Sequence, residues 1–167
     1  MSAFDRFMQW RLRNNTPARS AFVGDVTSQE RYKTMIDATI SPRLRELGLK
    51  GSGGKYELTS KTHWALLGFQ KSVYSDRQAI RFTVNLVAVT REAWEHGVEE
   101  HPHWGKRTSS GGMIYGAAVP IVRIGQAAGR EDIWWEFRAV DDIEATAAEV
   151  RADIEEFGLP WLHEHMQ

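Results

Sequence analysis

Histidine and glutamate side chains gather in the stretch 96–107, and residues of these two types can ligate zinc. Pro102 separates the last two histidines, and no His-x3-His spacing places two imidazoles on one helical face. A short histidine-rich tract without such spacing is weak evidence for a metal. We therefore predict no metal site here. The residues concerned are His96, Glu99, Glu100, His101 and His103.

The same stretch carries aromatic and cationic side chains, of which His103, Trp104 and Arg107 are candidate binding residues. Glycine, proline and a Ser-Ser pair follow, so we expect a helical turn near residue 91 and then a loop up to 118. A long loop in a compact domain is often functional. One alternative for function is therefore a small hydrolase-like or nucleic-acid-acting enzyme that uses the 96–107 loop.

The glycine-rich segment 47–58, LGLKGSGGKYEL, superficially resembles a phosphate-binding loop. Counted from Gly48, the lysine arrives one position late, at Lys55, and Tyr56 replaces the hydroxyl that would ligate magnesium. The segment also runs from a helix into a strand, whereas phosphate loops run from a strand into a helix N-terminus. We therefore predict a helix-to-strand turn and no nucleotide site.

The sequence gives no support for nucleophilic catalysis. It contains no cysteine and no Gly-x-Ser-x-Gly elbow. The adjacent carboxylates Asp141 and Asp142 lie where a helix should begin, and helix capping explains them better than acid–base catalysis. We name no catalytic residue and expect no cofactor.

Two long helices should frame the chain. The first spans 27–48: Thr27 and Glu30 fit a capping box, and Gly48 fits the helix end. Pro42 should kink this helix or restart it with Ser41 as the cap. The second helix begins at Asp141 or Asp142 and should stop at Gly158 and Pro160, because glycine and proline terminate helices. Residues 1–26 read as an N-terminal extension with a short helix, and 27–167 as a single domain.

Between the helices, apolar and polar residues alternate with the period of a β-strand. In 79–89, Ile80, Phe82, Val84 and Leu86 share one side, and Arg81, Thr83, Asn85 and Val87 share the other. Gly68 suggests a bulge in its strand. These patterns predict an α+β fold with about five strands, largely antiparallel, packed by the two long helices on one face. The predicted strands are 55–60, 63–75, 79–89, 119–125 and 132–140.

The outer face of this sheet should carry both polar and aromatic side chains. One interpretation is an ordinary solvated sheet face. The other is a binding surface, because Arg and Trp dominate the energetics of protein interfaces. If the strand alternation holds, Arg81, Arg123 and Trp134 should lie near one another. Such a surface would suit an acidic patch on a partner protein or a small anionic ligand. Its residues are Arg81, Asn85, Arg123, Trp134, Glu136 and Arg138.

Charge and hydropathy exclude some classes of partner. The 21 basic and 22 acidic residues leave a net charge of −1, so there is no strong nucleic-acid signal. No run of about 18 apolar residues exists, so we expect no membrane span. The N-terminus has no apolar core of a signal peptide. The expected location is the cytoplasm.

Several segments, taken together and in order, resemble a bacterial family known as domain of unknown function 4304 (DUF4304). They are SPRLRELGLK, a glycine turn before KYEL, FTVNLVAV, HWGKR, RIG, DIWWEF and FGLPWL. The resemblance covers about residues 30–162, and the first 26 residues and 105–118 depart from it. The family has no established activity, so the resemblance supports the fold and transfers no catalytic residue. We favour a non-catalytic binding or interaction module of unknown partner, such as an immunity-like protein that masks another protein.

Overall fold

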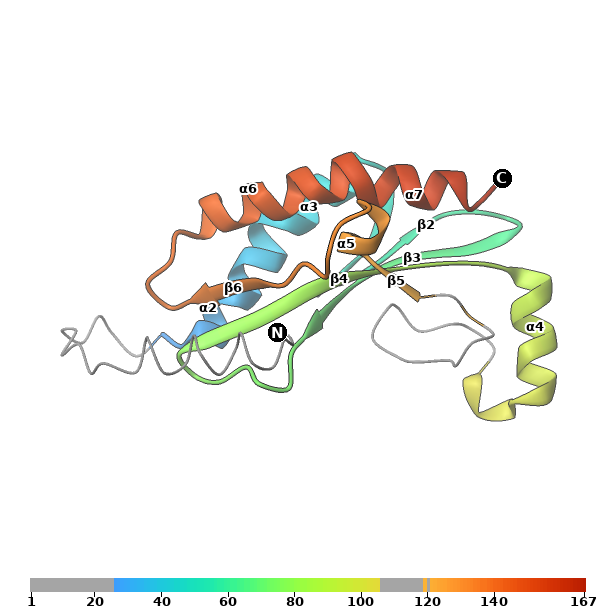
Figure 1. The fold of residues 1–167 in the computed structure, drawn as a ribbon, viewed down its shortest axis with the longest axis horizontal. Helices are drawn as coiled ribbons and strands as arrows, with labels where there is room; N and C mark the ends of the chain where they lie inside the picture. Colours follow the sequence, from blue (N-terminus) through green and yellow to red (C-terminus); the bar gives the residue numbers. More distant parts are fainter. Residues whose placement is uncertain (1–25, 106–118, 120) are drawn as a thin grey trace.

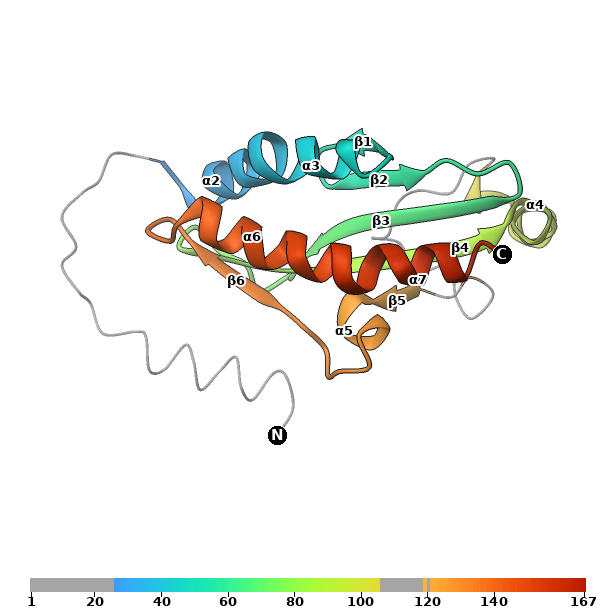
Figure 2. The same cartoon turned by 90° about the horizontal axis from the view of Figure 1, so that it is seen from above.

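The structure is a computed structural model that describes residues 26–105, 119 and 121–167. Two layers make up this part of the chain: an antiparallel sheet, and long helices that lie side by side across one of its faces (Figures 1 and 2). The predicted α+β architecture is thereby confirmed. In chain order the elements are α2 (Ser28–Thr34), η1 (Met35–Ile40), α3 (Ser41–Glu46), β1 (Leu49–Ser52), β2 (Lys55–Leu58), β3 (His63–Lys71), β4 (Ala79–Thr90), α4 (Arg91–Glu100), η2 (Pro102–Trp104), β5 (Ile121–Arg123), α5 (Ile124–Ala127), β6 (Trp135–Arg138), α6 (Ile143–Asp153), η4 (Ile154–Gly158) and α7 (Leu159–Glu164). The predicted N-terminal extension and the loop residues 106–118, Arg107 among them, lie outside the described residues.

Among the described residues, five strands pair in the order β1-β2-β3-β4-β5, and a sixth, β6, pairs with the beginning of β4. All of these pairings are antiparallel. β3 pairs with β4 along its whole length, from His63 opposite Thr90 to Lys71 opposite Phe82. The register is unbroken at Gly68, which lies opposite Asn85, so the predicted bulge is wrong. β1 is a further strand that the sequence pattern did not predict.

The first helix begins as predicted and then passes through its proline. Thr27 Oγ1 accepts the N–H of Glu30, and the Glu30 carboxylate accepts the N–H of Thr27 at 2.8 Å. Ser41 is not a cap that restarts the helix at Pro42, because its own backbone is helical and no side-chain cap hydrogen bond forms there. Instead η1 widens into a π-turn, in which the Ser41 N–H bonds to the Ile36 carbonyl. A wider turn accommodates the missing N–H and the bulk of the ring. The Ser41 hydroxyl lies 2.6 Å from the Tyr56 hydroxyl.

The last helix uses the same device, so the predicted stop at Gly158 and Pro160 is wrong. Asp142 caps α6 by accepting the N–H groups of Glu144 and Ala145. The helix then widens in η4, where the Leu159 N–H bonds to the Ile154 carbonyl, and continues as α7 past Pro160. The first and last helices are joined by a bidentate ion pair. Arg43 Nε and Nη2 donate to the two carboxylate oxygens of Glu155 at 2.9 and 2.8 Å.

The main core lies between these helices and the sheet. The predicted inward residues Ile80, Phe82, Val84 and Leu86 are all fully buried. Phe82 lies at the centre of an aromatic group, with ring centroids 5.0 Å from Tyr32, 5.6 Å from Trp135 and 6.2 Å from Phe69. The strand alternation read from the sequence is therefore correct for β4.

A second apolar cluster lies on the opposite face, near the end of β4. Residues 91–100 form the helix α4 rather than the predicted turn and loop, with the Thr90 hydroxyl accepting the N–H of Ala93. Trp94 from α4 is fully buried against Val87 and Val89 of β4. The outer sheet face is thus polar only along part of its length.

The glycine-rich segment is a set of turns, as predicted, although β1 lies inside it. Gly48 follows α3 with a φ of 91°. Gly53 and Gly54 form the two-residue turn of the β1–β2 hairpin, with φ values of 61° and 84°. Two successive positive φ values are typical of the type I′ hairpin turn, which favours glycine.

We predict that Gly51→Ala destabilises the protein much more than Gly53→Ala. Both positions have positive φ, at 140° and 61°. A Cβ at Gly51 would lie 2.0 Å from the Lys55 carbonyl oxygen, whereas at Gly53 nothing lies within 4 Å. Urea denaturation should show a loss of about 1 kcal/mol for Gly53→Ala and a clearly larger loss for Gly51→Ala. Equal losses would contradict the close backbone approach at Gly51.

We also predict that Phe82→Ala lowers the free energy of unfolding by about 3–5 kcal/mol, because it removes buried apolar surface and leaves a cavity. Val73→Ala is the matched control, because Val73 is 90% exposed in the β3–β4 connection. Chemical denaturation of both variants measures the difference. A Phe82→Ala loss below about 1 kcal/mol, the usual size of a surface effect, would place Phe82 outside the core.

Candidate functional site

Three of the predicted binding residues meet on the outer face of the sheet. Arg81 comes from β4, Arg123 ends β5, and Trp134 directly precedes β6. β5 and β6 pair with different parts of β4, and the outward alternation of the strands turns the three side chains toward one another. The guanidinium carbons of Arg81 and Arg123 lie 5.5 and 5.1 Å from the Trp134 ring centroid. Both distances are within the range of cation–π attraction.

Asp132 holds this arrangement in place, and the sequence analysis did not select it. One of its carboxylate oxygens accepts a hydrogen bond from Arg123 Nη1 at 2.5 Å and another from Trp134 Nε1 at 2.9 Å. A signal was present, because residues two apart in an extended segment point to the same side. We call Arg81, Arg123, Asp132 and Trp134 the arginine–tryptophan cluster.

The cluster is partly exposed, so its charged groups can meet a ligand. The Arg123 and Asp132 side chains are each 37% exposed, and Trp134 is half-buried. A guanidinium has five N–H donors, and the bond to Asp132 uses one of those on Arg123. The remaining donors of Arg123 can bind carboxylate or phosphate oxygens. The indole offers apolar area beside them.

Glu136 lies beside the cluster, directly opposite Arg81 in the β4–β6 pairing. Burial raises the pKa of its carboxyl group, while the positive charges of Arg138 and Arg81 act in the opposite direction. The raised pKa means that removal from water outweighs the attraction of the arginines. Glu136 therefore sits in a partly desolvated position at the border of the cluster.

Two other predicted binding residues on this face do not join the cluster. Arg138 is paired with Asp141 at 3.3 Å, and its backbone N–H donates to the same carboxylate at 2.8 Å. Asn85 faces the predicted side but is only 3% exposed, and its amide nitrogen donates to Gln70 Oε1 at 2.8 Å. Its burial removes Asn85 from the accessible part of the surface.

The remaining candidates, His103 and Trp104, lie in η2, which follows α4 (Figure 1). They are near the C-terminal end of β4, whereas β6 pairs with its N-terminal end. The Trp104 ring stacks on Trp94 at 5.2 Å and on His101 at 4.9 Å. Gly97 makes this packing possible, because a Cβ there would lie 2.3 Å from the Trp104 ring. Trp104 thus serves the second apolar cluster, and His103 is exposed.

The histidine-rich stretch shows no metal-binding geometry in the part of the chain that the structure describes. His96 is exposed and lies 3.7 and 3.8 Å from the carboxylates of Glu99 and Glu100, one turn along α4. Within residues 26–105, 119 and 121–167, no group of three or more His, Asp or Glu side chains could hold a metal ion. Across those same residues, no helix has the length and apolar character needed to span a membrane.

Comparison with known families identifies the family of the chain. The family described as domain of unknown function DUF4304 matches residues 40–164. The chain belongs to the DUF4304 family. Searches of curated proteins and of solved structures find no match. The matched segment contains the whole sheet and the arginine–tryptophan cluster, whereas α2 lies before it. The DUF4304 description names no activity, so any activity has to be argued from the geometry.

We predict that Glu136→Gln raises the free energy of unfolding at pH 7, by less than about 1 kcal/mol. Folding raises the pKa of Glu136, so the protonated carboxyl group stabilises the folded state relative to the ionised one. This contribution to stability is fully present below the unfolded pKa and is lost as the pH rises through the folded pKa. Gln resembles the protonated form, so the gain should vanish near pH 4. Urea denaturation at both pH values tests this, with the exposed Glu95→Gln as control. A variant less stable than wild type at pH 7 would show that the arginines outweigh the burial.

Proposed function

We propose that this DUF4304 protein is a non-catalytic binding module that recognises acidic groups of a partner protein through the arginine–tryptophan cluster. The observation that carries the proposal is the convergence of two guanidinium groups on one indole ring, at 5.5 and 5.1 Å. Asp132 accepts a hydrogen bond from Arg123 and so fixes one of the two guanidinium groups.

The chemistry of these side chains suits protein recognition. Arginine binds carboxylates through parallel N–H donors, and tryptophan supplies a large rigid contact area. Arg81 lies within β4, and Asp132 fixes both Arg123 and the indole. A cluster whose side chains are fixed in this way loses little side-chain entropy when a partner binds, which favours affinity.

An immunity-like role, in which the chain masks an acidic surface of another protein, is the form of binding that we favour, with the cytoplasm as the expected location. A small anionic ligand at the same cluster would use the same donors. The alternative enzyme built on the 96–107 loop has less support, because Trp104 packs between Trp94 and His101. His103 and Arg138 remain proposed contacts with the partner, secondary to the arginine–tryptophan cluster.

We predict that Arg123→Ala combined with Trp134→Ala weakens partner binding by at least about 30-fold, the effect of losing roughly 2 kcal/mol at an interface hot spot. The partner is first captured with the wild-type chain, identified, purified and then titrated by calorimetry. Affinity should also fall as salt concentration rises, because charged contacts are screened.

Arg45→Ala is the matched control, because Arg45 is an exposed arginine on α3, in the helical layer on the opposite face of the sheet. Circular dichroism and denaturation establish first that each variant is folded. If the double variant binds every captured partner as tightly as wild type does, the cluster is not the recognition surface. Binding of small anions alone, with no protein partner, would replace the proposed partner by a small ligand.

A further inference from the structure

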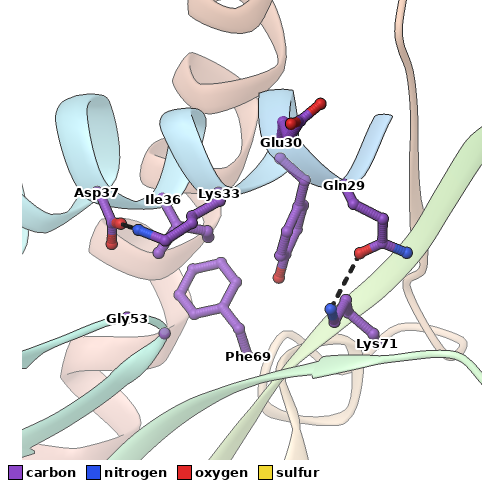
Figure 3. Close-up of a pocket in the computed structure, with 10 residues that line it drawn as sticks. Gln29, Glu30, Lys33, Ile36, Asp37, Gly53, Phe69 and Lys71 are labelled. Atoms are coloured by element: carbon purple, nitrogen blue, oxygen red, sulfur yellow. Dashed lines mark hydrogen bonds and ion pairs between the residues drawn. The ribbon is translucent and has the colours of Figure 1, made fainter. Parts of the chain in front are cut away.

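A cavity of about 440 Å³ lies between the first helix and the end of β3 (Figure 3). The cavity exists because β3 is longer than its neighbour β2. β3 continues to Lys71, but its pairing with β2 ends where Gly68 meets Lys55. The hairpin turn at Gly53 and Gly54 closes the space beside Phe69 without adding side chains, and the helix forms the opposite wall.

The walls of the cavity are largely aromatic and aliphatic. Tyr32 and Ile36, four residues apart, share one face of the helix and line it together with Phe69. The Phe69 ring is held by Tyr56 and Phe82, each with its ring centroid 6.2 Å away, and remains half-exposed. A planar apolar group can therefore stack or pack in this space with little rearrangement of the protein.

Charged groups occupy opposite ends of the cavity. At one end, Lys33 is neutralised by an ion pair with Asp37 (Figure 3). At the other end, Lys71 Nζ donates to the neutral amide oxygen of Gln29 at 3.1 Å. Nζ also lies 5.8 Å from the Tyr32 ring centroid. Lys71 forms no ion pair with any other residue that the structure describes.

The remaining acidic group at the rim does not compensate Lys71. The Glu30 carboxylate is turned away from the cavity in Figure 3. It accepts hydrogen bonds from the Thr27 N–H and hydroxyl at 2.8 and 3.0 Å, as part of the helix cap. The cavity thus combines apolar walls with one ammonium group, at its end, that no described carboxylate neutralises.

We propose that this cavity binds a small carboxylate with an aromatic body, whose ring lies against Tyr32 and Phe69 and whose carboxylate pairs with Lys71. The volume is within the range of small-molecule sites, roughly 300–1,000 Å³. Such sites combine a mostly apolar lining with a few polar groups that orient the ligand. An aromatic carboxylate matches the cavity in shape and in the sign of its charge. The site is separate from the arginine–tryptophan cluster.

The test uses the full chain with two probes of nearly equal shape, 3-phenylpropionate and its neutral amide. Titrations followed by ¹H–¹⁵N NMR should show saturable shifts for the acid in residues 29–37, 53–54 and 69–71. The amide should bind roughly five- to ten-fold more weakly, because it loses a charged hydrogen bond at a solvent-accessible position.

Lys71→Met keeps an unbranched side chain one atom shorter than that of lysine and removes its charge. In this variant we expect the acid to bind only as weakly as the amide, with the amide unaffected. Lys50→Met is the matched control, because Lys50 is exposed on β1 and does not line the cavity. Three results would each overturn the proposal: no saturable shift with the acid, equal binding of acid and amide, or acid-induced shifts that centre on Arg123 and Trp134.

Discussion

β4 is buried on both faces, and this constraint organises the rest of the molecule. Its twelve residues pair with β3, β5 and β6, and most of them are buried. Because side chains alternate along a strand, a shift of one residue would place Arg81 beneath the helices and Phe82 outside. Polar residues within the strand need partners for the same reason. Thr83 donates to the Ile133 carbonyl at 2.7 Å, and Asn85 donates to Gln70.

The helical layer adapts to the sheet through its prolines. Each long helix must extend far enough to cover the core face of β4, and each contains a proline that would ordinarily interrupt it. The π-turns η1 and η4 keep the helices continuous, at Pro42 and Pro160 respectively. A π-turn adds one residue to a turn, so it also rotates the following helical segment about its axis. The Arg43–Glu155 ion pair then joins the two helices.

Much of this architecture follows from local sequence patterns, and the missing parts depend on tertiary contacts. The alternation in β4, the capping box at Thr27 and the turn glycines are local signals, and the structure confirms them. β1 escaped prediction because three of its four residues are exposed and carry no alternating pattern. The helices continue through proline because packing against the sheet stabilises them. Rules based on helix propensity do not include this packing energy. The helix α4 is likewise stabilised by burial of Trp94.

The candidate site also has features that local sequence patterns predict and features that depend on tertiary contacts. Strand alternation was sufficient to predict that Arg81, Arg123 and Trp134 lie together, because their proximity depends on which way each side chain points. It could not reveal that Asn85 is buried, since burial depends on what covers the sheet. The cavity beneath α2 was also invisible in the sequence, because it arises from the unequal lengths of β2 and β3.

The strand order has a consequence for how the chain folds. β1 to β4 form a meander in which each strand pairs with the next, so these contacts close short loops and can form early. β6 pairs with Ala79–Phe82 only after more than fifty intervening residues, which carries a larger entropic cost. During synthesis, the core side of Phe82 therefore lacks its Trp135 neighbour until the C-terminal part of the chain has emerged. A nascent chain stalled before β6 would present an unpaired edge at the start of β4, which is the kind of surface that chaperones protect.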